Sequence, residues 1–253
     1  MSGAAFKGVE PIQLATFIKI SEALREVLYN AGSTSILPIG STGLISVMGD
    51  IDLAVAHPDG VSGLMKALEK NFEVRKMGSS TLSMKYPVGK RWVQVDMMVG
   101  NVDYLAWSRA FNPDQGIKGA ARNMLLVIAI RFISKHRWPN NGIDRTRLAL
   151  DFDVGLFLEK QTRQGKNKLN KEWKTIQKTF LTDDPDHIAK MLFDDISYRI
   201  LTFYGLVYTI KNSKELQPYV QQIIDAFITE VTNIDRKRPG AMGDIKYITS
   251  ALM

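Results

Sequence analysis

The sequence contains no cysteine and only three histidines, His57, His136 and His187, which lie far apart. The absence of cysteine excludes disulfides, zinc sites built on thiolates and cysteine nucleophiles, and it fits a reducing compartment. So few histidines argue against a histidine-rich metal site or a Ser-His-Asp triad. Thiol chemistry is therefore excluded, and imidazole chemistry is disfavoured.

Long apolar segments are also missing. No run approaches the ~18 consecutive apolar residues that a membrane-spanning helix needs. The N-terminal stretch MSGAAFKGVEPIQ shows no charged segment followed by an apolar one, and no obvious cleavage site. These absences predict a cytoplasmic protein with no membrane partner. The oligomeric state is not indicated by any pattern.

Positive charge is in excess, because 33 lysines and arginines stand against 26 aspartates and glutamates, for a net charge of +7. Such a balance favours a polyanionic partner, and a basic surface kept for solubility explains it equally well. The densest basic run is KQTRQGKNKLNKEWKTIQK, residues 160–178, in which Trp173 is available to stack on a base. We interpret this run as a solvated loop that leads into a surface helix.

The first half of the chain alternates between helical and strand-like patterns. Residues 11–30 carry apolar side chains at helical spacing, and strand-like runs follow. The full order is helix, two strands, helix, three strands and helix. This order is typical of an α+β fold built around a mixed β-sheet with flanking helices.

The second half has a different character. From about Gly116 onward every segment carries helical periodicity, and no strand candidate is convincing. Proline and glycine in FNPDQGIKG, residues 111–119, mark a junction. We therefore predict an α+β domain over residues 1–115 and an all-helical domain over residues 116–253.

Two aspartates interrupt an apolar run in GDIDLAV, at Asp50 and Asp52. In a strand, residues two apart point to the same face and lie ~6.5 Å from each other. Two carboxylates so close repel each other unless a cation sits between them, and Mg²⁺ or Mn²⁺ suits such oxygen ligands. Asp96, isolated in the apolar strand RWVQVDMMV, supplies a third ligand for a two-metal arrangement.

A Gly-Ser turn, Gly40-Ser41, lies upstream of the aspartates. Glycine lets the backbone approach a phosphate closely, and nearby N–H groups and the serine hydroxyl can donate to phosphate oxygens. Thr42 either assists Ser41 or caps a helical turn. A phosphate-binding turn beside a metal cluster is what phosphoryl or nucleotidyl transfer requires.

In this order, the elements resemble the signature of the DNA polymerase β-like nucleotidyltransferase superfamily. Ile39 precedes the Gly-Ser pair, Asp50-Ile51-Asp52-Leu53 follows after a slightly short spacer, and Asp96 lies on a later strand. The resemblance covers roughly residues 35–100. It implies a nucleotidyltransferase-like sheet in the catalytic domain, residues 1–115, and assigns residues 116–253 to no subfamily.

The resemblance also implies residue roles. Asp50 and Asp52 would bind both metal ions, and Asp96 would bind the catalytic ion and help deprotonate the attacking hydroxyl. Gly40 and Ser41 would hold the β- and γ-phosphates. The family reaction is attack of a hydroxyl on the α-phosphorus of a nucleoside triphosphate, with release of pyrophosphate.

Other polar residues have two explanations each. Lys118 and Arg122, four apart at the start of a helix, either reach the triphosphate from one helix face or are solvated there. Ser83 and Lys85 share a strand face and either reach the nucleotide or keep an edge strand soluble. Arg109 is polar in an apolar context, and no role is assigned to it.

The acceptor and the activity leave alternatives open. The acceptor is an RNA 3′ end, a protein hydroxyl or a small molecule, and the basic charge favours RNA, including tRNA. A glycosyltransferase that uses Asp-x-Asp to hold a nucleotide sugar is a second hypothesis, but it explains neither the Gly-Ser turn nor Asp96. A third is an inactive relative that binds nucleotide or nucleic acid.

Overall fold

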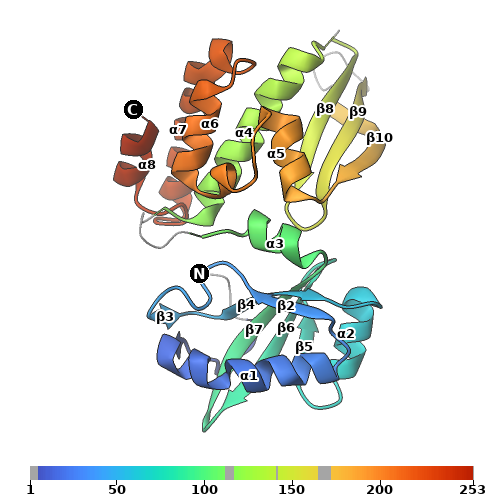
Figure 1. Cartoon of the computed structure of the whole chain (residues 1–253), viewed down its shortest axis with the longest axis vertical. Coiled ribbons are helices and arrows are strands. Elements are labelled where there is room, and N and C mark those ends of the chain that lie inside the picture. The colour runs from blue at the N-terminus through green and yellow to red at the C-terminus, as the bar shows by residue number, and fades with distance from the viewer. Residues whose placement is uncertain (1–4, 112–116, 141, 165–171, 253) are drawn as a thin grey trace. The chain divides into compact units, whose positions relative to one another are not determined.

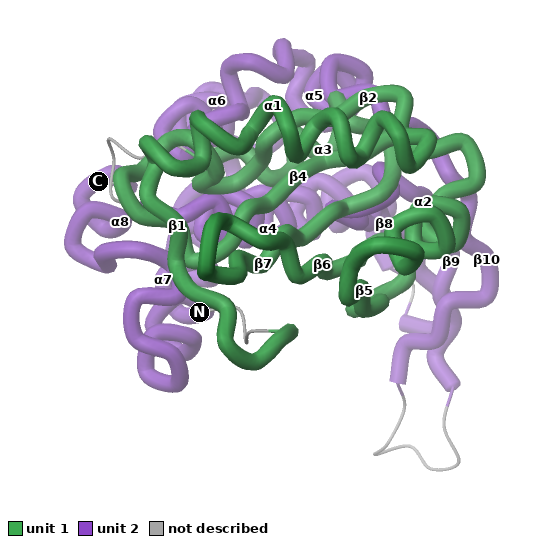
Figure 2. The backbone as a smooth tube through the Cα atoms, turned by 90° about the horizontal axis from the view of Figure 1, so that it is seen from below, with its two compact units in different colours: residues 1–114 green, residues 115–253 purple. Residues whose placement is uncertain are grey.

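The computed structural model describes residues 5–111, 117–140, 142–164 and 172–252. The chain divides into two compact units, residues 1–114 and 115–253, which Figure 2 distinguishes by colour. The division falls one residue from the expected boundary. Within the described ranges, no helix is both long and apolar enough to cross a membrane.

The first unit is built around a five-stranded mixed sheet in the order β2-β4-β7-β6-β5 (Figure 1). Strands β4 and β7 are parallel, and the other neighbouring pairs are antiparallel. Strands β1 and β3 form a separate antiparallel pair. The elements are β1 (Ile12–Gln13), α1 (Leu14–Asn30), β2 (Ser35–Pro38), β3 (Val47–Met48), β4 (Ile51–Ala56), α2 (Gly60–Leu68), β5 (Glu73–Lys76), β6 (Thr81–Val88), β7 (Arg91–Val99) and α3 (Val102–Ser108).

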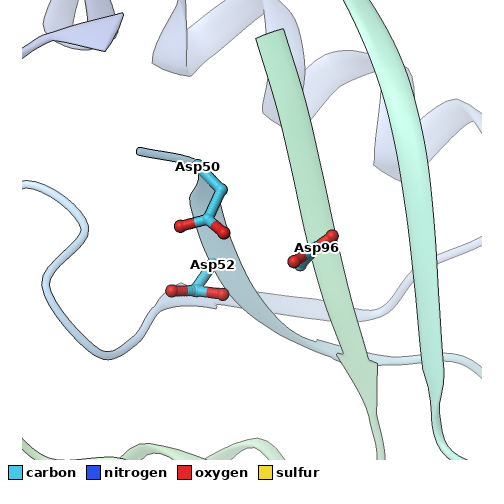
Figure 3. A group of neighbouring side chains, drawn as sticks. All are labelled: Asp50, Asp52 and Asp96. Carbon is cyan, nitrogen blue, oxygen red and sulfur yellow. The ribbon is translucent and has the colours of Figure 1, made fainter. Parts of the chain in front are cut away.

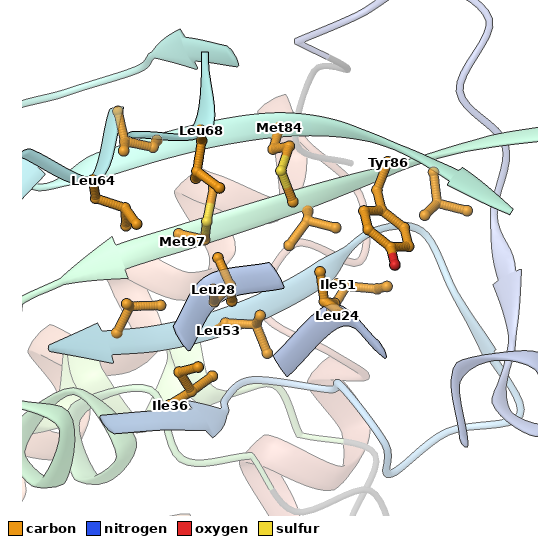
Figure 4. Close-up of a cluster of buried hydrophobic side chains, with 14 of the residues drawn as sticks. Leu24, Leu28, Ile36, Ile51, Leu53, Leu64, Leu68, Met84, Tyr86 and Met97 are labelled. Carbon is orange, nitrogen blue, oxygen red and sulfur yellow. The ribbon is translucent and has the colours of Figure 1, made fainter. Parts of the chain in front are cut away.

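Helices α1 and α2 pack on one face of this sheet (Figure 4). Leu28 of α1 and Leu64 of α2 are fully buried against alternate residues of the strands, such as Ile51 and Leu53 of β4. Because successive strand residues point to opposite faces, this alternation turns Asp52 and Ala54 to the other face. There Ala54 packs with Leu105 of α3. The first unit thus confirms the α+β expectation of a mixed sheet with flanking helices.

The second unit combines helices with a three-stranded antiparallel sheet, in the order β10-β9-β8. The prediction that residues 116–253 are all helical is therefore wrong. The elements are α4 (Gly119–Arg137), β8 (Asp144–Asp151), β9 (Gly155–Gln164), β10 (Glu172–Thr182), α5 (Pro185–Phe193), the 3-10 turns η2 (Arg199–Leu201) and η3 (Gln217–Tyr219), α6 (Phe203–Asn212), α7 (Val220–Lys237) and α8 (Ile245–Leu252).

The basic run at residues 160–178 is part of this sheet. The first residues of the run belong to β9, which ends at Gln164, and its last residues belong to β10, which begins at Glu172. Residues 165–171 lie outside the described residues. The expected surface helix is therefore wrong, because β10 is a strand, and the expected loop falls on residues that the structure does not describe. Strand β10 is paired on one side and exposed over most of its length, so its polar pattern does not reveal a strand.

Candidate metal centre

Three carboxylates meet at the junction of β4 and β7 (Figure 3). Asp52 and Asp96 are register partners on these two parallel strands, and Asp50 directly precedes β4. One carboxylate oxygen from each residue lies within 4.8 Å of the others. The structure therefore brings together the three aspartates that the sequence singled out.

The alternation of both strands explains why the carboxylates share one face. Ile51, Leu53 and Val55 of β4 lie in the core, as do Val93, Val95 and Met97 of β7. Side chains between these positions must point to the opposite face. Parallel pairing in this register then sets Asp52 beside Asp96.

The pKa of the Asp52 carboxyl is raised to about 7, first by burial and then by the neighbouring Asp50 and Asp96 charges. The Arg109 guanidinium acts against this shift. A carboxyl so strongly perturbed by burial and like charges is a candidate functional group, because a cation would relieve both effects.

Asp96 is held by two buried polar side chains. The Ser83 hydroxyl donates to Asp96 Oδ1 at 2.6 Å, and Gln94 Nε2 donates to Oδ1 and Oδ2 at 3.0 and 3.1 Å. Gln94 in turn accepts the backbone N–H of Ala5 at 2.7 Å. Burial raises the pKa of Asp96, while the hydrogen bonds from Ser83 and Gln94 oppose the rise and Asp50 adds to it.

The turn after β2 lies directly against Asp52. Gly40 has a φ of +59°, which favours glycine, and a Cβ added there would crowd the Asp52 carboxylate, at 3.3 Å from its Oδ2. The buried Thr42 hydroxyl accepts the Asp52 N–H at 2.7 Å, which fixes the turn to the start of β4. Ser41 is half-buried, and its carbonyl accepts the N–H of Leu44 at 3.1 Å.

Two residues beyond the signature lie in the second unit. Lys118 precedes α4 and is exposed, whereas Arg122 is 2% exposed, and its Nε donates to the carbonyl of Ile200 at 3.0 Å. The explanation that both side chains are solvated at the helix start is therefore wrong for Arg122. A nucleotide contact by either residue stays a prediction.

Polar residues around the carboxylates complete the site. Arg109 is the C-cap residue of α3, and its charge lowers the pKa of Asp52. The signal in the sequence was an arginine within the apolar stretch YLAWSRAF, to which no role was assigned. Ser83, considered as a nucleotide contact, donates to Asp96 instead. Lys85 Nζ lies 4.0 Å from Glu73 Oε2 and 5.2 Å from the centre of the Trp92 ring.

The donor set fits a hard divalent cation. Carboxylate oxygens are the ligands that Mg²⁺ and Mn²⁺ prefer, and one or two carboxylates plus substrate phosphates complete a Mg²⁺ shell. The close approach of three acids, with Asp52 mostly buried, is the arrangement that such an ion would stabilise. Asp50, Asp52 and Asp96 are thus the candidate ligands.

The sequence matches no protein-family model, and a comparison with curated proteins finds no match. The resemblance to nucleotidyltransferases therefore depends on the residues themselves and on their geometry.

Proposed function

We propose that the chain is a metal-dependent nucleotidyltransferase, which moves a nucleoside monophosphate from a nucleoside triphosphate to a hydroxyl acceptor and releases pyrophosphate. The observation that carries the proposal is the convergence of Asp50, Asp52 and Asp96 within 4.8 Å, on one face of two neighbouring strands. The net charge of +7 favours an RNA acceptor, with its 3′ hydroxyl as nucleophile.

The three aspartates would hold Mg²⁺ or Mn²⁺, which when bound neutralises phosphate charge and lowers the pKa of the attacking hydroxyl. Asp96 accepts the proton of that hydroxyl at a carboxylate oxygen. The hydroxyl oxygen forms a bond to the α-phosphorus, the bond to the bridging oxygen breaks, and pyrophosphate leaves with the electron pair. Ser83 and Gln94 keep the Asp96 carboxylate in one orientation through their hydrogen bonds.

The turn at Gly40 and Ser41 would bind the β- and γ-phosphates. The backbone of this turn lies beside Asp52, since even a Cβ added at Gly40 would lie only 3.3 Å from Asp52 Oδ2. Backbone N–H groups at such a turn can donate to phosphate oxygens. The triphosphate would therefore lie between the turn and the carboxylates, and Arg109 would supply positive charge from α3.

The test is transfer of label from each nucleoside triphosphate in turn, with Mg²⁺ or Mn²⁺ and bulk RNA as acceptor, measured together with pyrophosphate release. We expect Asp52→Asn and Asp96→Asn to lower the rate ~1,000-fold, since several kcal/mol of charge stabilisation is removed. Asp59→Asn is the matched control, because this exposed acid lies outside the cluster. Equal rates in all three variants would contradict the proposal.

The other activities give different results in the same assay. Consumption of a nucleotide sugar without pyrophosphate release would identify a glycosyltransferase. Nucleotide binding that needs no metal and survives Asp52→Asn, with no transfer, would identify an inactive binding protein. Label found on protein or on a small molecule in place of RNA would keep the transferase and change its acceptor.

A further inference from the structure

The sheet of the second unit has two unlike faces. On one face Leu148 and Leu156 are buried, and the Leu148 N–H donates to Ser134 Oγ of α4 at 2.8 Å. The opposite face carries charged and aromatic side chains that are paired across the strands, such as Trp173 with Arg163 and Lys178 with Glu159. We call this the basic–aromatic face, and its main residues are Arg145, Arg147, Arg163, Trp173, Lys178 and Phe180.

Positive charge is in excess on the basic–aromatic face. Its central acid, Glu159, is 7% exposed and is neutralised by Arg147, whose Nη2 lies 2.8 Å from Glu159 Oε2. Arg145 donates to the neutral Gln161 at 2.8 Å. Asp151, at the end of β8, shares this face by register, so two carboxylates stand against four cations and the face keeps a net positive charge.

Aromatic rings are interleaved with these cations. The Arg145 guanidinium lies 4.3 Å from the centre of the Trp173 ring, and that of Arg163 lies 5.8 Å from the same ring. Lys178 Nζ lies 3.9 Å from the centre of the Phe157 ring, which packs edge-to-face against Phe180 at 5.5 Å. Phe180 is itself 50% exposed, so its ring is accessible beside these cations.

We propose that the basic–aromatic face binds single-stranded nucleic acid. Lysine and arginine would contact the phosphates, and unpaired bases would stack on the rings and the guanidinium planes. A duplex hides the faces of its bases, so it would use the cations and leave the rings without a partner.

Binding of single-stranded nucleic acid to this face is independent of the chemistry at the aspartates. Its use as the acceptor of a nucleotide rests on the proposed function. The two claims separate experimentally, because the basic–aromatic face belongs to the second unit and the carboxylates belong to the first.

The test is fluorescence anisotropy with a labelled 20-nucleotide RNA of mixed sequence, titrated over a range of salt concentrations. Arg163→Glu/Lys178→Glu is the test variant, and Lys237→Glu/Lys246→Glu is its matched control with the same change in charge. The control lysines are exposed on α7 and α8, which are not part of the sheet that carries the basic–aromatic face. Circular dichroism verifies that both variants fold.

We expect the test variant to weaken RNA binding at least tenfold more than the control does. We also expect the slope of log K against log salt to fall by about 1.4, since each lost phosphate contact removes ~0.7 for single strands. Phe180→Leu keeps the charge and is expected to weaken binding about tenfold, the scale of one stacked base.

Single-stranded DNA serves as a second arm and a duplex of the same sequence as a third. Tighter binding of either single strand than of the duplex supports the proposal, and a preference for RNA would identify RNA as the strand concerned. Equal binding by the test variant and the control, or failure to bind any oligonucleotide, would overturn it. All titrations are repeated without nucleotide in Asp52→Asn, so that loss of transfer activity cannot be mistaken for loss of strand binding.

Discussion

The two sheets of this protein are alike in having one apolar face, and their other faces carry side chains of opposite charge. In each, apolar side chains cover one face and pack against helices, as Leu53 does in the first unit and Leu148 in the second. The other face of the first sheet carries the three aspartates, and that of the second carries arginine, lysine and aromatic residues.

The difference lies in how each face holds its charges. Asp96 is held by Ser83 and Gln94, both almost fully buried, and burial is the largest cause of the raised pKa of Asp52. Lys178 and Phe180, by contrast, are exposed. Close, rigid and partly buried carboxylates suit a small cation. A wider exposed face suits a flexible polymer, whose phosphates are solvated on one side.

The largest effect on stability is expected from the apolar faces that the two sheets share. Leu53→Ala and Leu148→Ala each truncate a buried leucine, and each is expected to lower the free energy of unfolding by about 2–5 kcal/mol. Ile176→Ala is the control, because this β10 side chain is 61% exposed. Its cost is expected to stay within about 0.5 kcal/mol. Urea denaturation followed by circular dichroism measures all three, and a cost for Ile176→Ala equal to that for Leu148→Ala would break the comparison.

A smaller effect on stability is expected from pH, through the acidic face of the first sheet, which carries Asp50, Asp52 and Asp96. In the folded protein the pKa of Asp52 is raised from 3.8 to about 7, so the folded state holds a proton that the unfolded state has already lost. The resulting loss of stability is absent below about pH 4, grows as the pH rises towards 7, and is complete above it. Between pH 5 and pH 7.5, the metal-free protein is expected to lose at most about 3 kcal/mol.

The matched control for this pH effect is Asp52→Asn, which removes the titrating group. Its free energy of unfolding in a chelator is expected to change less between pH 5 and pH 7.5 than that of the unaltered protein. Excess Mg²⁺ is expected to stabilise the unaltered protein more at the higher pH, because it binds the ionised carboxylates. Identical pH profiles for the two proteins would show that Asp52 is not the source.

The smallest of these effects concerns the turn beside the aspartates. Thr42→Val keeps the shape and removes the hydroxyl that accepts the Asp52 N–H at 2.7 Å, so it is expected to cost about 1–3 kcal/mol. Thr42→Ser keeps the hydroxyl and is expected to retain more of the stability and of the transfer activity. An equal loss in both variants would mean that the threonine methyl group, and not its hydroxyl, holds the turn.

The acidic face was largely predictable from the sequence. Apolar residues at alternate positions around Asp52 and Asp96 fix both the strands and the face on which the acids lie. The register that makes these two residues partners depends on pairing between distant segments, which no local pattern contains. The same reason explains why Ser83 was not recognised as a partner of Asp96.

The sheet of the second unit was not predicted, and its sequence explains why. Leu148 and Leu150, and then Leu156 and Leu158, alternate over spans too short to separate from helical spacing, and leucine is a strong helix former. Strand β10 is mostly exposed, so it lacks a buried apolar face that would reveal it. Pairing in the sheet prevails over these local preferences.

The central claim is that the three aspartates hold a divalent cation. Titration of Mn²⁺ followed by electron paramagnetic resonance tests it directly, because bound Mn²⁺ loses the sharp signal of the free ion. The unaltered protein is expected to reduce the free signal at neutral pH, and Asp52→Asn and Asp96→Asn are expected to restore most of it, while Asp59→Asn leaves the binding unchanged. A free Mn²⁺ signal that is the same for the unaltered protein and for Asp52→Asn would contradict the account.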